Sequence, residues 1–211
     1  MQSRFAWTEE YKLKNLQLRL LVSVVFLAIA LYLYSSFLSF VEAREGFSFN
    51  DPVLNLFNPV DLTWLIFTAI YLSLLTGIII LIRNPVRLIL AFHVYTVLIL
   101  VRMAAMYTVP FNPPVSMIPL NDPFVQFFGT GKLLTKDLFF SGHTSTLFML
   151  FLVVDKKPVK QIFFLLAVIV AVCVILQHVH YFIDVFAAPF FTYGCYILVK
   201  RVGDRQNRQY F

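Results

Sequence analysis

The chain has 211 residues, of which 60% are apolar, 17% aromatic and only 13% charged. This composition excludes an ordinary soluble domain of this length and indicates an integral membrane protein. The basic residues behind the formal net charge of +6 lie in short clusters between apolar runs, a pattern of membrane topology that argues against a nucleic-acid partner. Both cysteines fall inside apolar runs, so a structural disulfide is not expected.

The first half of the chain contains three apolar runs, each near the roughly 20 residues that cross the hydrocarbon core of a bilayer. Residues 1–19 precede them and carry four basic residues together with Trp7 and Tyr11, which predicts an amphipathic segment at the membrane interface. The predicted spans are residues 20–41, 62–82 and 88–109.

Half of the ten prolines lie in the longest connection, residues 110–137, which excludes a continuous helix there. Three shorter apolar runs follow, at residues 138–154, 162–177 and 181–199. A basic tail, residues 201–211, ends the chain. The sequence therefore predicts an all-α, multi-pass membrane protein, a six-transmembrane helix bundle whose single domain covers residues 20–200.

The basic residues also predict which way the bundle is inserted. Thirteen of the 17 lysines and arginines lie in the N-terminal segment, in the turns after the second and fourth spans, and after the sixth span from Lys200 onward. The positive-inside rule then places both termini in the cytoplasm and residues 42–61, 108–140 and 177–181 on the opposite side. Polar groups at the heads of the fourth and sixth spans are therefore expected at the non-cytoplasmic face.

Two polar clusters stand at those positions. Ser141, Gly142 and His143 open the fourth apolar run, and His180 and Asp184 open the sixth. Ionisable groups within or at the edge of a span are expensive, so they indicate a functional site. The predicted topology brings both clusters to one depth, together with Arg102 of the third span and Asp61 at the head of the second.

These residue types suit phosphoryl transfer through a phosphohistidine. His180 and Asp184 are four positions apart, so on a helix they share a face, and the carboxylate would fix the imidazole tautomer and leave the other nitrogen as a nucleophile. His143 could protonate a leaving group. Ser141 and Gly142 at a helix N-terminus suit a phosphate oxygen, and Arg102 would add a permanent cation. No metal ion or cofactor is expected.

The sequence also permits other interpretations of these polar residues. Arg102 could be no more than the counter-ion of Asp184, and polar residues in spans often only link helices. His143 and His180 could instead ligate haem, which a Soret band in the purified protein would reveal. A small transporter or a structural bundle is a further alternative. His93 and His178 are predicted to be structural or interfacial.

The two clusters also resemble a known pair of motifs. Asp137-x-x-Phe140-Ser141-Gly142-His143-Thr144 and His180-Tyr181-x-Ile183-Asp184-Val185 are similar to the catalytic motifs of the sphingomyelin synthase family, within the type 2 phosphatidic acid phosphatase superfamily. The stretch 95–110, which contains Arg102, is similar to the family's third-span motif, and residues 59–61 match its Pro-x-Asp motif in part. The resemblance covers about residues 59–200.

The resemblance implies an enzyme with His180 as nucleophile, Asp184 as its orienting group and His143 as the acid for the departing lipid alkoxide. The remaining motif residues would bind the substrate or its phosphate: Ser141, Gly142, Arg102, Asp137 and Tyr181. A phospholipid donor would pass its phosphoryl or phospho-headgroup to ceramide or diacylglycerol, or to water in a lipid phosphate phosphatase. Thr135 and Lys136 replace the family's usual cysteine and glycine, and no Arg-Pro pair of the phosphatase signature occurs.

Overall fold

The computed structural model describes residues 16–120 and 134–208, and their regular structure is helical. The only extended pairing among the described residues is an isolated bridge between Phe47 and Phe111. The all-α prediction is confirmed for this part of the chain. The elements are α2 (Leu16–Ala43), η1 (Leu54–Leu56), α3 (Thr63–Leu81), α4 (Pro85–Thr108), α6 (Gly142–Val153), α7 (Lys157–Leu176) and α8 (Phe182–Arg208).

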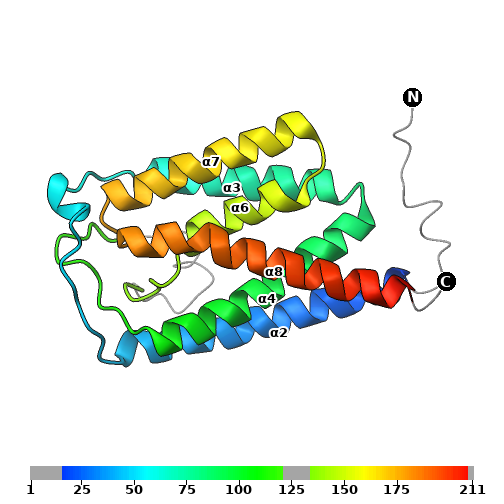
Figure 1. The fold of residues 1–211 in the computed structure, drawn as a ribbon, viewed down its shortest axis with the longest axis horizontal. Coiled ribbons are helices and arrows are strands. Elements are labelled where there is room, and N and C mark those ends of the chain that lie inside the picture. Colours follow the sequence, from blue (N-terminus) through cyan, green and yellow to red (C-terminus); the bar gives the residue numbers. More distant parts are fainter. Residues whose placement is uncertain (1–15, 121–133, 209–211) are drawn as a thin grey trace.

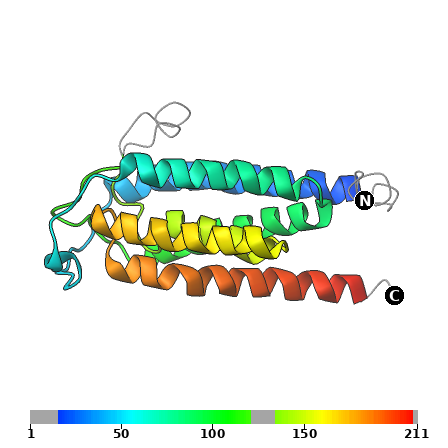
Figure 2. The ribbon, with the colours of Figure 1, turned by 90° about the horizontal axis from the view of Figure 1, so that it is seen from above.

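Successive helices run up and down the bundle (Figures 1 and 2). The connections after α2, after α4 and between α7 and α8 gather at one end, which we call the loop end. The short turns after α3 and α6 lie at the other end, beside the start of α2 and the end of α8. This course of the chain is the alternation expected from the sequence. Which end faces the cytoplasm stays a prediction.

Five helices are long and apolar enough to cross a membrane: α2, α3, α4, α7 and the Phe182–Gly203 part of α8. The exception is α6, whose 12 residues extend about 18 Å, well short of a hydrocarbon core of about 30 Å. The predicted fourth span is therefore too long at its start. Eight of the 12 residues of α6 are buried, since the helix packs against α4, α7 and α8 instead of facing lipid alone.

Two helices begin ahead of the predicted apolar runs, each with a proline in its first turn. The α4 helix starts at Pro85, because the Asn84 side chain accepts a hydrogen bond from the Arg87 amide and proline suits the first helical turn. The α7 helix likewise starts at Lys157, ahead of its apolar run, with a proline in its first turn. Toward the two ends of the chain, α2 begins inside the predicted interfacial segment and α8 continues into the predicted tail. Residues 1–15 and 209–211 of these segments lie outside the described residues.

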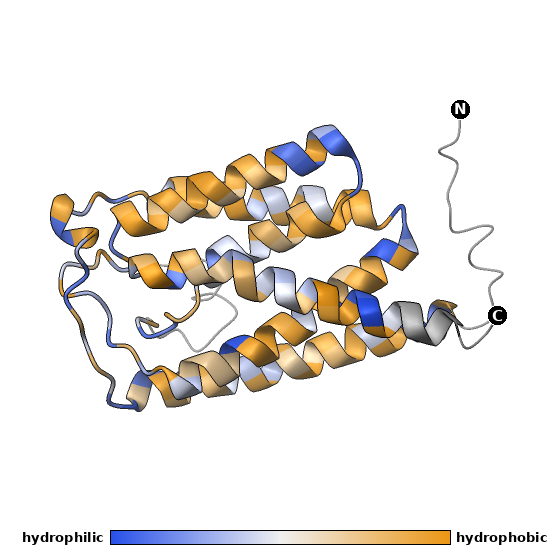
Figure 3. Ribbon diagram, in the orientation of Figure 1, coloured by the Kyte–Doolittle hydropathy of each residue, from blue (hydrophilic) through white to orange (hydrophobic). Residues whose placement is uncertain are grey.

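Apolar residues make up most of the helices (Figure 3), and many large apolar side chains are exposed on the outside of the bundle while others are buried in its core. Only 11% of the most apolar window of α2 is buried, and Tyr32 and Trp64 are 73% and 82% exposed. Continuous apolar surface of this extent would be costly in water, and it supports a multi-pass integral membrane protein. Inside the bundle, Leu147 of α6 and Val170 of α7 are fully buried in the central cluster.

Candidate active site

His180 and Asp184 form a buried pair at the loop end. The distance between His180 Nδ1 and Asp184 Oδ2 is 3.4 Å, and the two side chains are 1% and 0% exposed. Helix α8 begins only at Phe182, so His180 precedes it and the two residues do not share a helix face as expected. The pair forms because Asp184 folds back over the start of the helix, where its Oδ2 also accepts from the Tyr181 amide at 3.1 Å. The bond from the Tyr181 amide to the Asp184 side chain corresponds to one half of a capping box.

His143 is the second residue of α6, and its ring lies next to that of His180. The centroids of the two imidazole rings are 5.9 Å apart, with the planes at 67°. The two motifs are also joined through the backbone, because the Ser141 amide donates to the Asp184 carbonyl at 3.0 Å. The structure therefore brings together the three residues expected to be catalytic. It does so with the N-termini of α6 and α8 side by side.

The N-terminus of α6 is shaped for close approach by a cation. Ser141 caps the helix through its side-chain oxygen and the Thr144 amide. Gly142 follows, and a Cβ atom at this position would lie 2.5 Å from Arg102 Nη1. Only glycine leaves room for the guanidinium there. The positive end of the helix and a permanent cation thus meet at one point, which is an arrangement that attracts anions.

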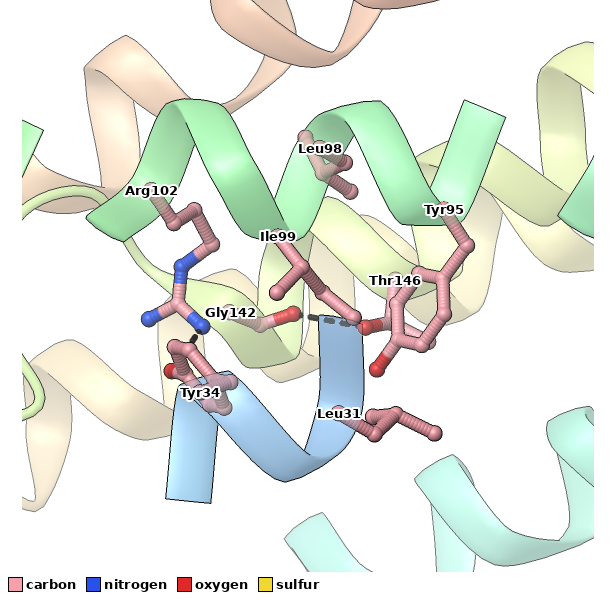
Figure 4. Close-up of a pocket in the computed structure, with 8 residues that line it drawn as sticks. All are labelled: Leu31, Tyr34, Tyr95, Leu98, Ile99, Arg102, Gly142 and Thr146. Carbon is pink, nitrogen blue, oxygen red and sulfur yellow. Dashed lines mark hydrogen bonds between the residues drawn. The ribbon is translucent and has the colours of Figure 1, made fainter. Parts of the chain in front are cut away.

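Arg102 is 6% exposed, and all its nitrogens hydrogen bond within the protein. Its Nε donates to the Phe140 carbonyl at 2.9 Å, Nη1 to the Tyr34 hydroxyl at 2.6 Å and Nη2 to Asp137 Oδ1 at 2.6 Å. Figure 4 shows Tyr34 of α2 and Arg102 of α4 turned toward each other, with Gly142 nearby. The counter-ion of Arg102 is therefore Asp137, and the alternative that it is Asp184 is wrong.

Asp137 lies just before α6 and completes this network. Its Oδ1 accepts from both Arg102 and Tyr34, the latter at 2.8 Å. Burial raises the pKa of the Asp137 carboxyl, but the Arg102 guanidinium, the Tyr34 hydrogen bond and the nearby histidines lower it more. The net result is a pKa below the ordinary value. The carboxylate therefore stays ionised and keeps its ion pair with Arg102 at neutral pH.

Tyr181 lies beside the histidines, but its side chain points toward the loops. The ring stacks on Phe49 at 4.1 Å between centroids and meets Phe111 edge-on. The hydroxyl donates to the Asn112 carbonyl at 3.0 Å. Tyr181 thus anchors the turn before α8 to two distant loops, and its assignment as a binding residue stays a prediction.

Three residues that sequence reasoning missed hold the site together. Asp51, which is buried in the loop after α2, accepts from the Phe182 amide at 2.7 Å and so caps α8 from 131 positions away. Glu42 at the end of α2 accepts from the backbone amides of Thr135 and Lys136, the residues that depart from the family pattern. Tyr34 is the third. No local signal could reveal them, because capping rules connect only residues close in sequence.

The other two histidines have structural partners. His93 Nε2 lies 2.9 Å from the Ser23 hydroxyl and links α4 to α2. His178 Nδ1 lies 2.5 Å from the Ser116 hydroxyl, and the backbone of His178 has a φ of 56°, in the left-handed region. Burial lowers the pKa of His178 below its ordinary value. Within residues 16–120 and 134–208, no group of three or more His, Cys, Asp and Glu side chains is arranged to hold a metal ion.

Part of the chain matches a known protein family. Residues 136–201, about a third of the chain, match the family model described as PAP2 superfamily C-terminal. This range contains His143, His180, Asp184 and Asp137, and it extends over α6, α7 and most of α8. The match supports the type 2 phosphatidic acid phosphatase superfamily, and at a general level an enzyme that acts on membrane lipid phosphates. A search of the curated proteins found no match.

Proposed function

We propose that the protein is a lipid phosphotransferase of the sphingomyelin synthase type. It would move a phosphoryl or phospho-headgroup from a phospholipid to the hydroxyl of ceramide or diacylglycerol. One arrangement carries the proposal. His143 and the His180–Asp184 pair lie together at the N-terminus of α6, and the Arg102 side chain lies against Gly142 of the same N-terminus. The family match to residues 136–201 supports the general chemistry.

In the proposed mechanism each group has a role in two half-reactions. The substrate phosphate binds near Ser141, Gly142 and Arg102, where the helix dipole and the guanidinium offset its charge. His180 attacks phosphorus through Nε2, since Nδ1 faces Asp184; a nitrogen–phosphorus bond forms and the bond to the lipid oxygen breaks. His143 donates a proton to that departing oxygen.

The second half-reaction reverses the first with a different alcohol. The acceptor hydroxyl loses its proton to His143 and attacks phosphorus, and the bond to His180 breaks. The buried carboxylate of Asp184 stabilises the imidazole in its charged state and keeps its orientation in both steps. Asp137 would act indirectly, by holding Arg102. Tyr181 would act by fixing the turn that carries His180.

The second candidate is a lipid phosphate phosphatase, and the superfamily match is the observation that favours it. In this case water replaces the lipid hydroxyl as acceptor, and the same three residues perform the same steps. The choice between the two depends on the shape of the acceptor pocket and on exclusion of water.

The distribution of basic residues supports an active site at the non-cytoplasmic face. The described lysines and arginines of the turns after α3 and α6, and those near the end of α8, lie opposite the loop end. These residues are Arg83, Arg87, Lys156, Lys157, Lys160, Lys200 and Arg201. By the positive-inside rule that end faces the cytoplasm, which puts the histidine pair on the other side.

A turnover assay in lipid vesicles tests the proposal. Fluorescent ceramide and diacylglycerol are offered with mixed phospholipids, and phosphatidic acid is offered for release of free phosphate. His180→Ala, His143→Ala and Asp184→Asn are compared with His93→Ala, which removes a histidine of α4 away from the site. We expect the three site variants, when folded, to lose turnover by on the order of a thousandfold, and His93→Ala to retain it. Equal turnover in folded His180→Ala and His93→Ala would refute the mechanism.

A further inference from the structure

Tyr34 is the residue of α2 whose side chain reaches the candidate active site. Its hydroxyl accepts from Arg102 Nη1 at 2.6 Å and donates to Asp137 Oδ1 at 2.8 Å. Arg102 Nη2 contacts the same carboxylate oxygen at 2.6 Å, so the three polar groups form a closed triangle. Two of its members belong to the predicted site, and the third lies outside both the family match and the stretch that carries the resemblance.

Tyr34 makes these buried polar contacts from a helix that is mostly exposed. Most of α2 is exposed on the surface of the bundle, and its main packing partner is α4. At its C-terminal end, Glu42 holds the amides of Thr135 and Lys136 at 2.9 and 3.0 Å. The segment that carries Asp137 is thus tied to α2 at two places. The position of Tyr34 relative to Arg102 is therefore well defined.

The Tyr34 hydroxyl controls the part of the guanidinium that faces α6. Nη1 is the atom that would lie 2.5 Å from a Cβ at residue 142, and Tyr34 is its partner. The other contacts, to Asp137 and to the Phe140 carbonyl, hold Nη2 and Nε. Without the hydroxyl, the edge of Arg102 that faces the helix N-terminus loses its tether.

A cavity lies beside Arg102, so the hydrogen bond to Tyr34 is needed to fix the guanidinium on this side. It encloses about 40 Å³, enough for at least one water molecule, and is lined by Tyr34, Arg102, Gly142, Thr146 and apolar side chains such as Leu98 (Figure 4). Tight packing does not confine the guanidinium on this side. Its position against α6 is fixed by hydrogen bonds, and space exists for it to move when one of them is removed.

We infer that Tyr34 is a positioning residue that holds Arg102 against the α6 N-terminus, so that the guanidinium meets the anionic phosphate of a lipid substrate. The inference rests on the proposed function, because it takes the phosphate to bind at Arg102 and Gly142. It adds a contribution from α2, the first of the described helices, to a site whose other members come from α4 and from the region of α6 and α8.

Tyr34→Phe tests the inference with Tyr32→Phe as its matched control. Both substitutions remove one hydroxyl from the same helix, and Tyr32 is 73% exposed on the outer surface. We expect Tyr34→Phe to raise KM for the phospholipid donor, and the inhibition constant of orthovanadate, about tenfold or more, with kcat changed far less. A hydrogen bond to a charged group that orients binding predicts this split. Tyr32→Phe should match the parent protein.

A double variant distinguishes positioning from general packing. Lysine at residue 102 cannot make the planar three-point contact, so in an Arg102→Lys background Tyr34→Phe should cause little further rise in KM. Vanadate-induced shifts in melting temperature, each measured against the variant's own baseline, extend the test to a destabilised Tyr34→Phe protein. A shift equal to that of the parent would overturn the inference.

The outcomes separate the two proposals. If His180→Ala abolishes turnover while Tyr34→Phe and Tyr32→Phe give the same KM and vanadate affinity, the inference about Tyr34 is wrong and the proposed function stands. If His180→Ala keeps its turnover, the proposed function is wrong, and vanadate affinity alone decides the role of Tyr34. A parent protein that neither turns over lipid nor binds vanadate overturns both.

Discussion

Gly142→Ala is the substitution that tests the meeting of Arg102 with the start of α6 most directly. The added Cβ would lie 2.5 Å from Arg102 Nη1, 2.7 Å from Cζ and 3.0 Å from Nη2. The first two distances are below those of real Cβ contacts and the third is very tight, so something must shift. The guanidinium is the end of a flexible side chain, but its hydrogen bonds oppose movement away from the helix.

The loss of stability expected from Gly142→Ala follows from the hydrogen bonds that Arg102 would break. A hydrogen bond to a charged group contributes roughly 1.5–3 kcal/mol, whereas alanine in place of glycine in a helix gains at most about 1 kcal/mol. Loss of even one Arg102 contact therefore gives a net destabilisation of about 0.5–2 kcal/mol, and loss of two gives more. Because the displaced guanidinium would no longer face the proposed phosphate site, we expect turnover to fall at least tenfold.

Two other glycines provide controls for the same change. Gly194→Ala on α8 meets nothing within 4 Å and should be neutral or slightly stabilising. Gly77→Ala on α3 would place a Cβ 2.8 Å from a Leu150 methyl, which should lower stability without lowering turnover of the folded protein. Melting temperatures in detergent and turnover in vesicles are measured for all three. The reasoning is refuted if Gly142→Ala melts and turns over like Gly194→Ala.

Two further predictions concern Asp51 and Asp137. Asp51→Ala removes the cap of α8, so we expect the free energy of unfolding to fall by about 1–2 kcal/mol and kcat to fall as well. Asp51→Asn keeps an acceptor and should lie closer to the parent. Equal melting temperatures and kcat for the two variants would contradict this. The pKa of Asp137 is below its ordinary value of about 4, so its contribution to stability is complete above pH 4 and is lost as the pH falls further. Melting temperature should therefore drop from pH 5 to pH 3 more steeply in the parent than in Asp137→Asn, and parallel curves would disprove the role of the ion pair.

The sequence by itself determined the class of the protein, and it predicted which residues come together at the candidate site. Long apolar runs must be helical in a membrane, because only helices satisfy every backbone hydrogen bond within one segment. The alternation of such runs then places the starts of the fourth and sixth at the same end, which is why the sequence alone sufficed to pair His143 with His180. The family match to residues 136–201 covers both histidines and supports the superfamily.

Only the tertiary structure decided how the polar groups pair. The helices are apolar on nearly all sides, so no polar stripe in the sequence reveals how each one is rotated about its axis. Rotation and depth decide that Arg102 meets Asp137 and Tyr34, and that Asp51 reaches the start of α8. The same holds for α6, where capping and loop contacts make the helix begin four residues inside the apolar run. These pairings are long-range, and they follow from packing because a buried polar group takes whichever partner the fold brings within reach.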